Sequence, residues 1–431
     1  MELYIKKQEK NWIYFQIVFS ALCGFLVSQF HFPSSITYIT DLVLVYILFR
    51  CRYKTRKAIG YAHLKTLQIF LICLIMLTIF GTFSNLSVLT PLRYLWGFRN
   101  TGRTFIFLFC CVTLLDEGDL SKIFKIFDII LYINVILCSW QYWVQNLWCD
   151  RVGGIFGTNY GCLAYMQLHL CFVCIFHLSA FVNRKESLRR LLITLLSCFY
   201  LATITELKIF YVEFVIFIFI VLILNRAMTL RTFAMVIVAI LAFNIGMQLL
   251  STVLPPAAET LTIEGIIGNL TSENGYTSSG DLSRLTAINE LKDIFFADDL
   301  WGHLFGFGLG NCETSSVSIL NTPFYRTYSY LNYRWFTDAM VYLEAGIVGV
   351  VLFYMTLVSC FAVGYKYRKI ISNNTMWSTG MVLTVSIIIN TIYNSSFRTE
   401  AGYMTAFALS IVFVLIKCSA VEKGNIENEH I

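Results

Sequence analysis

Residues 255–311 read PPAAETLTIEGIIGNLTSENGYTSSGDLSRLTAINELKDIFFADDLWGHLFGFGLGN, and a Tyr-rich run ending in NYRWFTD at 332–338 follows them. The chain on either side of this segment is mostly apolar. A hydrophobic protein that keeps one long polar segment on a single side of a membrane usually carries its specific chemistry there. We therefore expect the apolar remainder to be a scaffold that presents this segment and the helix ends around it.

The composition indicates an all-α polytopic membrane protein. Of the 431 residues, 57% are hydrophobic and 13% are charged, whereas soluble domains carry roughly a quarter charged residues. The formal charge of +6 does not indicate a nucleic-acid partner, because the Lys and Arg residues fall mainly in short connecting loops. The 14 cysteines lie mostly inside apolar stretches, where Cys behaves as a small hydrophobe. No metal site and no cofactor are predicted.

Hydropathy predicts about twelve membrane spans. They form a first block within 1–254 and a second block within 337–420, separated by one large loop at 255–336, with a polar tail at 421–431. The predicted spans are roughly 12–30, 36–50, 66–86, 98–115, 126–147, 160–182, 191–205, 207–224, 232–254, 337–363, 379–396 and 402–418.

The distribution of basic residues predicts the orientation. Arg50 and Lys65 flank the loop after the second span, and Lys185 and Lys366 follow the sixth and tenth spans. Short cytoplasmic loops carry an excess of Lys and Arg. Both termini are therefore expected in the cytoplasm, with the 255–336 loop facing outward.

Several cations then face outward, against this bias, and they suggest a site for a phosphorylated ligand. Each of them could instead be a headgroup anchor whose side chain reaches the interface. As a group, with outward helix N-termini that attract anions, they favour the ligand site. The outward cations are Arg93, Arg99, Arg103, Arg151, Arg284, Arg326, Arg334, Arg398, Lys208 and Lys292.

The stretch RVGGIFGTNYG at 151–161 directly precedes the sixth span. Gly154 permits a close approach of backbone to a ligand, Arg151 stands at the start of the stretch, and Asn159 is expected to cap the following helix. The alternative is a plain turn, since Gly is common in turns.

The stretch SSGDLSRLTAINELKDIFF at 278–296 predicts an amphipathic helix capped by Asp281. Arg284 would then fall in its first turn, where a cation opposes the helix dipole unless an anion is bound. The following GHLFGFGLGN contains Gly308 and lacks a P-loop pattern, so its glycines predict only a close approach of backbone.

Three carboxylates stand at or near predicted outer helix ends. Asp338 begins the tenth span, which Thr337 is expected to cap, and either Asp338 or Glu206 could act as a base. Asp338 could equally serve only to favour the helix dipole. Glu213 lies inside a predicted span, where a carboxylate is a functional candidate or a buried partner of Lys208.

Over about residues 148–350 the sequence resembles the superfamily of bacterial O-antigen polymerases (Wzy-type) and O-antigen ligases. Three elements carry the resemblance: a basic, Gly-containing stretch before a span, an outward loop with an Arg and a Gly-rich turn, and a span containing spaced glycines. The matching residues are Arg151, Gly154, Phe156 and Asn159 in the first, Arg284, Gly306, Gly308 and Gly310 in the second, and Gly346 and Gly349 in the third, with Thr158 where the family usually has Pro.

The ligases usually carry a His-Asn pair ahead of the third element, and this chain has Phe-Thr-Asp at 336–338 instead. The departure favours a polymerase. The resemblance implies a metal-independent glycosyltransferase with a helical fold of the C type. Its substrate would be an undecaprenyl-pyrophosphate-linked oligosaccharide in the outer leaflet of a bacterial cytoplasmic (inner) membrane, and a chain-length regulator would be a protein partner.

On this reading Arg284, Asp338 and Glu206 are the expected catalytic residues. Arg151, Gly154, Asn159, Lys208, Gly308 and Arg334 are the expected substrate-binding residues. The alternatives are a ligase that transfers glycan to another acceptor, and a flippase or transporter of the same lipid-linked sugar. Transporters tend to show internal repeats and broken spans at the midplane, and no repeat is visible here.

Overall fold

The computed structural model describes residues 2–51, 64–85, 90–226, 281–315 and 317–429, and within these ranges the chain is helical with no β-strand. The predicted span at 232–254 and the start of the predicted loop lie outside the described residues. The α-helices are α1 (Glu2–Gln29), α2 (Tyr38–Cys51), α4 (Lys65–Ser84), α5 (Pro91–Leu114), α6 (Glu117–Trp143), α7 (Cys162–Val182), α8 (Leu188–Ile204), α9 (Lys208–Leu224), α13 (Ala287–Phe295), α14 (Leu300–Phe305), α15 (Pro323–Tyr328), α16 (Thr337–Lys366), α17 (Asn374–Tyr393) and α18 (Gly402–Glu429).

The all-α membrane class is confirmed, because eight of the described helices are long and apolar enough to cross a membrane. Three further predicted spans coincide with α5, α8 and α9, which are not among the helices long and apolar enough to cross a membrane. Both α8 and α9 have 17 residues, below the roughly 20 that a perpendicular span needs. The eight spans are Glu9–Gln29, Ser34–Cys51, Lys65–Phe83, Glu117–Trp143, Cys162–Val182, Thr337–Lys366, Asn374–Tyr393 and Gly402–Ala420.

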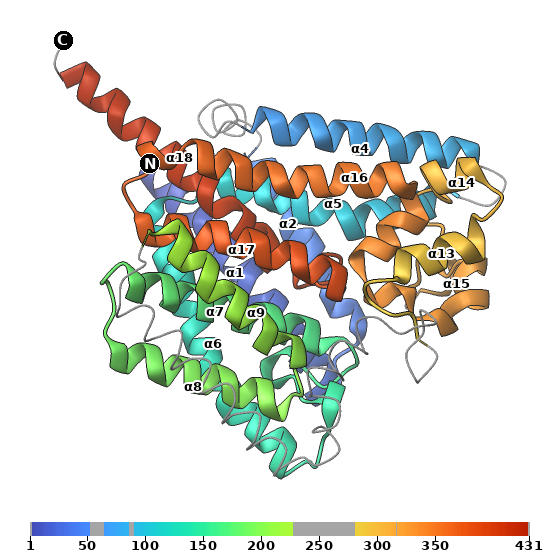
Figure 1. Ribbon diagram of the computed structural model, residues 1–431, viewed down its shortest axis with the longest axis horizontal. Coiled ribbons are helices and arrows are strands. Elements are labelled where there is room, and N and C mark those ends of the chain that lie inside the picture. Colours follow the sequence, from blue (N-terminus) through green and yellow to red (C-terminus); the bar gives the residue numbers. More distant parts are fainter. Residues whose placement is uncertain (1, 52–63, 86–89, 227–280, 316, 430–431) are drawn as a thin grey trace.

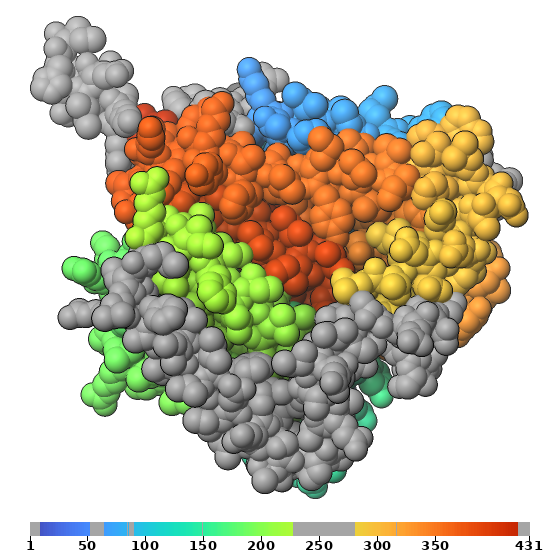
Figure 2. Space-filling view, in the orientation of Figure 1, coloured from blue at the N-terminus to red at the C-terminus, as the bar shows by residue number. Residues whose placement is uncertain are grey.

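The long helices lie side by side, and the two termini are found at the same end of the bundle (Figure 1). The short helices α13, α14 and α15 lie at the opposite end, beside the start of α16. In the space-filling view the segment that begins at 281 covers this end of the bundle (yellow in Figure 2). Segments far apart in the sequence therefore meet there.

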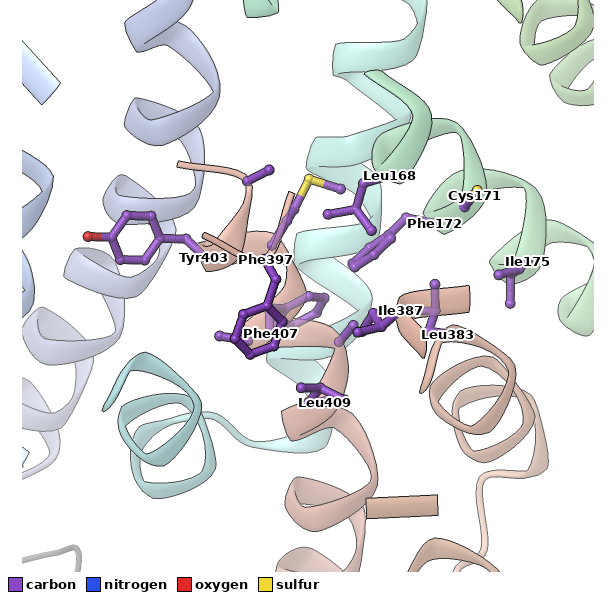
Figure 3. Close-up of a cluster of buried hydrophobic side chains, with 14 of the residues drawn as sticks. Leu168, Cys171, Phe172, Ile175, Leu383, Ile387, Phe397, Tyr403, Phe407 and Leu409 are labelled. Carbon is purple, nitrogen blue, oxygen red and sulfur yellow. The ribbon is translucent and has the colours of Figure 1, made fainter. Parts of the chain in front are cut away.

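The centre of the bundle is formed by α7, α17 and α18. In the apolar stretches of α7 and α18, 83% of the residues are buried, against 28% in α4, so α4 is peripheral. Phe172 of α7, Ile387 of α17 and Phe407 of α18 belong to one cluster of buried side chains (Figure 3). This packing fixes the helix ends on which the site described below is built.

The Gly-rich turn after α14 packs directly on a kink in α16. Gly346 interrupts that helix with φ 66° and ψ −171°, which leaves the carbonyl groups of Leu343 and Glu344 without their usual helical donors. The backbone N–H of Phe307 donates to the Leu343 carbonyl oxygen (2.7 Å), and that of Gly308 donates to the Glu344 carbonyl oxygen (3.1 Å). The turn at 306–310 and the kink are therefore one structural unit.

Candidate functional site

Arg284 is not in a helix, contrary to the prediction from 278–296. The helix α13 begins only at Ala287, and its N-cap Thr286 makes no side-chain cap. Asp281 lies five residues ahead of this N-cap, and its carboxylate instead accepts a hydrogen bond from the side-chain amide of Asn332. The argument that the dipole of this helix disfavours Arg284 is therefore wrong.

The guanidinium of Arg284 is instead held by aromatic rings. Its Cζ lies 4.2 Å from the centroid of the Tyr393 ring and 5.8 Å from that of Phe336, and its Nε donates to the backbone carbonyl of Tyr393 (3.3 Å). Within the described part of the chain its two Nη atoms make no hydrogen bond. The Nε edge and one face are fixed, so the Nη atoms are positioned to donate to the oxygens of a ligand.

Arg284, Glu206 and Lys208 each lie close enough to Asp150 to act on it electrostatically. Burial raises the pKa of the Asp150 carboxyl, and the carboxylate of Glu206 raises it further, whereas Arg284 and Lys208 lower it. Asp150 precedes α7, Glu206 and Lys208 stand at the junction of α8 and α9, and Arg284 precedes α13. Three separate segments thus place two cations and a second carboxylate within electrostatic reach of Asp150, a residue that the sequence pattern did not indicate.

Glu206 has a backbone conformation that favours glycine. Its φ is 56°, and it stands just beyond the end of α8, where the N–H of Leu207 donates to the carbonyl of Ala202 (2.8 Å) and its own N–H donates to that of Thr203 (3.1 Å). Glycine is the usual residue at this position of a helix terminus. A glutamate in this conformation carries backbone strain, which is a feature found at functional sites.

The 151–161 stretch folds as a turn packed into the bundle. Gly154 is buried with φ 57°, its N–H donates to Oε1 of Gln141 (2.7 Å), and its carbonyl accepts from Nε2 of the same Gln141 (3.1 Å). The backbone N–H and carbonyl of Gly154 are therefore both hydrogen-bonded to a side chain of the protein itself. Arg151, at the start of the stretch, is exposed.

Asn159 does not cap the following helix. The N-cap of α7 is Gly161, in a left-handed conformation and without a side-chain cap, and Asn159 contributes its backbone carbonyl to the N–H of Cys162 (3.1 Å). The side chain of Asn159 is exposed. The start of α7 therefore lies two residues later than predicted.

Asp338 is buried at the start of α16, with 5% of its surface exposed. Its carboxylate accepts a hydrogen bond from the backbone N–H of Ala339 (2.7 Å), which is the arrangement expected of a residue that favours the helix dipole. Thr337 is not the cap of this helix, since its hydroxyl donates to the carbonyl of Asn394 (2.9 Å). That bond joins the start of α16 to the segment that carries Tyr393.

Gly308 and Arg334 are not among the residues that act on Asp150, and Glu213 acts, like Arg284 and Asp150, on Tyr393. Gly308 belongs to the buried turn that is bonded to α16. Arg334 is exposed, with its guanidinium 5.1 Å from the centroid of the Tyr325 ring. Glu213 is fully buried and accepts from the side chains of Gln167 (2.9 Å) and Asn390 (2.9 Å), so it is not an ion-pair partner of Lys208 as the sequence had suggested.

A second cluster of polar side chains lies at the same end of the bundle as the charged residues around Asp150. The sequence did not predict that these side chains meet. Arg398 is 7% exposed, and its Nη2 donates to Glu313 and, at 2.9 Å, to Oε2 of Glu344. Asn100 donates to Glu313 (2.8 Å), and the N–H of Gly310 donates to Oε1 of Glu344 (2.9 Å). Burial alone would lower the pKa of Arg398, but Glu344 and then Glu313 raise it above its usual value. The cluster therefore keeps its cation charged.

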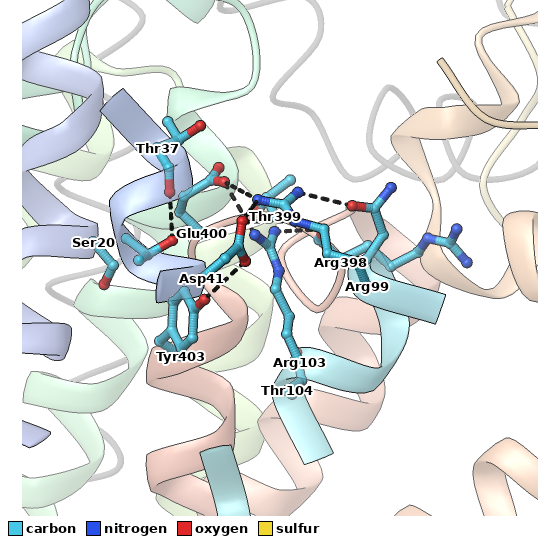
Figure 4. A network of polar contacts seen from close by, with 12 residues as sticks. Ser20, Thr37, Asp41, Arg99, Arg103, Thr104, Arg398, Thr399, Glu400 and Tyr403 are labelled. Carbon is cyan, nitrogen blue, oxygen red and sulfur yellow. Dashed lines mark hydrogen bonds and ion pairs between the residues drawn. The ribbon is translucent and has the colours of Figure 1, made fainter. Parts of the chain in front are cut away.

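A chain of ion pairs extends this cluster towards α2 and α18 (Figure 4). Arg99 donates to Asp41 (2.7 Å from Nη2), and Arg103 pairs with Glu400 (3.2 Å). Burial alone would raise the pKa of Glu400, but Arg103 and then Arg99 lower it below its usual value. These contacts tie α2, α5 and the α17–α18 connection together, and they occupy the cations at 99, 103 and 398 that the sequence had grouped with the ligand site.

Of the expected site residues, the structure thus brings Arg284, Glu206 and Lys208 together around Asp150. We call these four residues the charged group. Arg151 adjoins it in sequence, and Asp338 is joined to its rim through Thr337 and Asn394. Family models give no match to the chain, and a search of curated proteins gives no relative.

Proposed function

We propose that this protein is a membrane polymerase that joins undecaprenyl-pyrophosphate-linked oligosaccharide repeats into an O-antigen or capsule-type polysaccharide. The observation that carries the proposal is the convergence of Arg284, Lys208, Glu206 and Asp150 at the end of the bundle that also carries α13 to α15. A pair of cations suits a pyrophosphate, and adjacent carboxylates suit the activation of a sugar hydroxyl.

The proposed roles follow from the geometry of the charged group. Arg284 holds phosphate oxygens through its Nη atoms, since its Nε and one face are occupied by Tyr393. Lys208 adds positive charge as the leaving group gains negative charge, and Arg151, which is exposed beside Asp150, contributes from the rim.

Glu206 is the proposed base. In the reaction, the oxygen of an acceptor hydroxyl bonds to the anomeric carbon of the donor glycan, the bond from that carbon to the pyrophosphate breaks, and the proton passes to the carboxylate. Glu206 lies in an accessible turn within the charged group, whereas Asp338 is buried and bonded to its own helix. We therefore favour Glu206 over Asp338.

The proposed orientation places the charged group outside. The end with both termini would be cytoplasmic, in line with the Lys and Arg bias, and the outer leaflet would supply the lipid-linked substrate. Reporter enzymes fused after residues 186 and 370 should report the cytoplasm, and one fused near residue 275 should report the outside. A cytoplasmic signal near 275 would contradict the proposal.

The direct test uses purified protein in liposomes that contain a lipid-linked repeat unit as the only glycan. A polymerase converts this substrate into a ladder of longer glycans that remain lipid-linked. A ligase leaves the repeat unchanged until a second acceptor is added, and a flippase moves it across the bilayer without forming a new glycosidic bond. Either of these two results would overturn the proposed function.

A further inference from the structure

An elongated cavity of about 360 Å³ lies between α4, α5 and α16. On α4 it is lined from Gln68 to Thr78, and on α5 from Phe98 to Phe109. At about 1.5 Å per residue, each of these stretches is roughly 15 Å long. The cavity is therefore a slot that runs parallel to the helices, in the direction that a lipid chain takes in a bilayer.

The wall of the slot is mainly hydrocarbon, and part of it faces outward from the bundle. Leu71, Phe105 and Val341 line it from the three helices. Ile72 and Ile75 of α4 also line it and are 59% and 38% exposed. Because α4 and α16 are candidate membrane spans, a ligand for this slot would come from the bilayer.

Polar groups gather towards one end of the slot, where Glu344 and Arg398 line it beside Thr101. Among the described residues, the buried Nη1 of Arg398 has no hydrogen-bond partner, and the same holds for the hydroxyl of Thr101. A buried donor that lacks an acceptor costs about 1–3 kcal/mol. An oxygen on the end of an apolar ligand would satisfy the Nη1 of Arg398.

The charges at this end favour an uncharged oxygen. Arg398 is already bonded to two carboxylates, those of Glu313 and Glu344. These two carboxyl groups already balance the charge of the guanidinium, and Glu344 itself lines the slot. A phosphate would therefore bring uncompensated negative charge into a medium of low dielectric constant, which costs free energy.

We propose that the slot between α4, α5 and α16 binds the chain of a lipid that ends in an uncharged oxygen, as in a long-chain alcohol, with that oxygen accepting from Arg398. The site is separate from the charged group around Arg284, and the proposal does not depend on the proposed function. Fatty and isoprenoid alcohols share this chemistry.

The test is photo-crosslinking of the purified full-length protein with a diazirine-bearing fatty alcohol, followed by peptide mapping. Labelling should be saturable and fall on peptides of α4, α5 and α16. The phosphate monoester of the same probe should require about tenfold higher concentration, since the charge of Arg398 is already balanced by its two partners. Competition by unlabelled fatty alcohol and by farnesol then tells whether the slot prefers an acyl or an isoprenoid chain.

Two variants fill the slot, and one matched variant does not. Thr101→Phe and Leu71→Trp should each abolish saturable labelling while the protein stays folded, as judged by thermal melting. Ile136→Phe, at a position on α6 that is 70% exposed, should leave labelling unchanged. Non-saturable labelling of wild-type protein, equal labelling by the phosphate ester, or unchanged labelling in a folded slot-filling variant would each overturn the proposal. If neither filled variant folds, the wild-type map and the comparison of the two probes still decide it.

Discussion

Gly306 and Gly346 lie backbone against backbone: a Cβ on Gly306 would come within 2.7 Å of the Gly346 nitrogen, and one on Gly346 within 2.3 Å of the carbonyl carbon of Leu304. Both residues have positive φ, of 72° and 66°. The Gly-rich turn and the kink in α16 therefore require glycine for space and for conformation. The resemblance to the O-antigen superfamily rests partly on these glycines, and here their role is to join the loop segment to α16.

Gly346→Ala should destabilise the protein strongly. Essentially only glycine adopts φ 66° with ψ −171°, and an alanine in this conformation costs of the order of 1–3 kcal/mol. The contact with Leu304 adds to this because backbone atoms cannot move aside. Thermal melting in detergent would measure the loss. Gly118→Ala is the matched control, since a Cβ at Gly118 meets nothing within 4 Å; an equal loss in both variants would contradict this account of the kink.

Glu206→Gly should stabilise the protein and remove its activity. Glycine relieves about 1–2 kcal/mol of strain at positive φ and loses about 0.4–1 kcal/mol through the greater freedom of the unfolded chain. A higher melting temperature combined with lost polymerisation is the result expected of a functional residue kept at a cost.

Arg184→Gly is the control for that experiment. Arg184 has φ 58° and occupies the equivalent position after α7, where the N–H of Lys185 donates to the carbonyl of Ala180 (2.8 Å). It should gain similar stability and keep full activity. Unimpaired polymerisation by Glu206→Gly would remove Glu206 from the site.

His177, near the end of α7 that is remote from Asp150, should contribute strongly to the stability of the folded protein. Its Nδ1 lies 2.7 Å from Glu186 and its Nε2 lies 2.8 Å from Asp128. Carboxylates only accept, so both ring nitrogens donate and the ring is an imidazolium. His177→Gln removes one cation and leaves Asp128 and Glu186 sharing Arg190, at a cost of the order of 3 kcal/mol.

The matched variant is His169→Gln, because His169 is equally buried but contacts only the backbone carbonyl of Phe127 (3.0 Å) among the hydrogen-bond partners in the described chain. It should cost much less in thermal melting than His177→Gln. Adding Asp128→Asn to His177→Gln should restore part of the lost stability, since it removes the surplus charge. Failure of the second change to recover any stability would argue against a buried charge pair.

The ion pair of Glu400 predicts a dependence of stability on pH. Because Arg103 and Arg99 lower the pKa of Glu400 in the folded protein, the folded state binds its proton less readily than the unfolded state does. The contribution is therefore fully present above the unfolded value of about 4.3 and is lost as the pH falls through the lower folded value.

Glu400→Gln removes this contribution at all pH values. The difference in melting temperature between wild type and Glu400→Gln should be constant from pH 6 to pH 8, in about the range where the carboxylate is fully ionised, and should shrink under acid conditions. A difference that stays the same down to about pH 3 would show that the ion pair is not its source.

The apolar spans could be predicted from the sequence because each depends on a local run of residues, and eight of them are found as long apolar helices. The start of α13 could not be predicted in this way. Asp281 has a side chain typical of a helix cap, but its carboxylate accepts a hydrogen bond from Asn332, 51 positions further along the chain. Local patterns do not reveal such competing partners.

Some residues of the candidate site could likewise be predicted from the sequence, and others could not. Arg284, Glu206 and Lys208 could be selected because charge is unusual at the outer ends of apolar helices. Their neighbour Asp150, and the pairing of Arg398 with Glu313 across 85 positions, depend on tertiary contacts that one sequence does not display. Glu344 could have been found, because the rule that selected Glu213 applies equally to a carboxylate inside the span of α16.

The most direct test of the central claim is the rate at which Arg284 variants polymerise a lipid-linked repeat in liposomes. Removal of one preorganised charge-stabilising group usually costs about 10²–10³ in rate, so Arg284→Ala should lose about that factor at unchanged protein level. Arg284→Lys should recover only part of it, because an ammonium cannot hold phosphate oxygens in the bidentate geometry. Arg326→Ala, which removes an exposed cation of α15 from the same end of the bundle, should polymerise at the wild-type rate. Wild-type polymerisation by a normally folded Arg284→Ala protein would contradict the account.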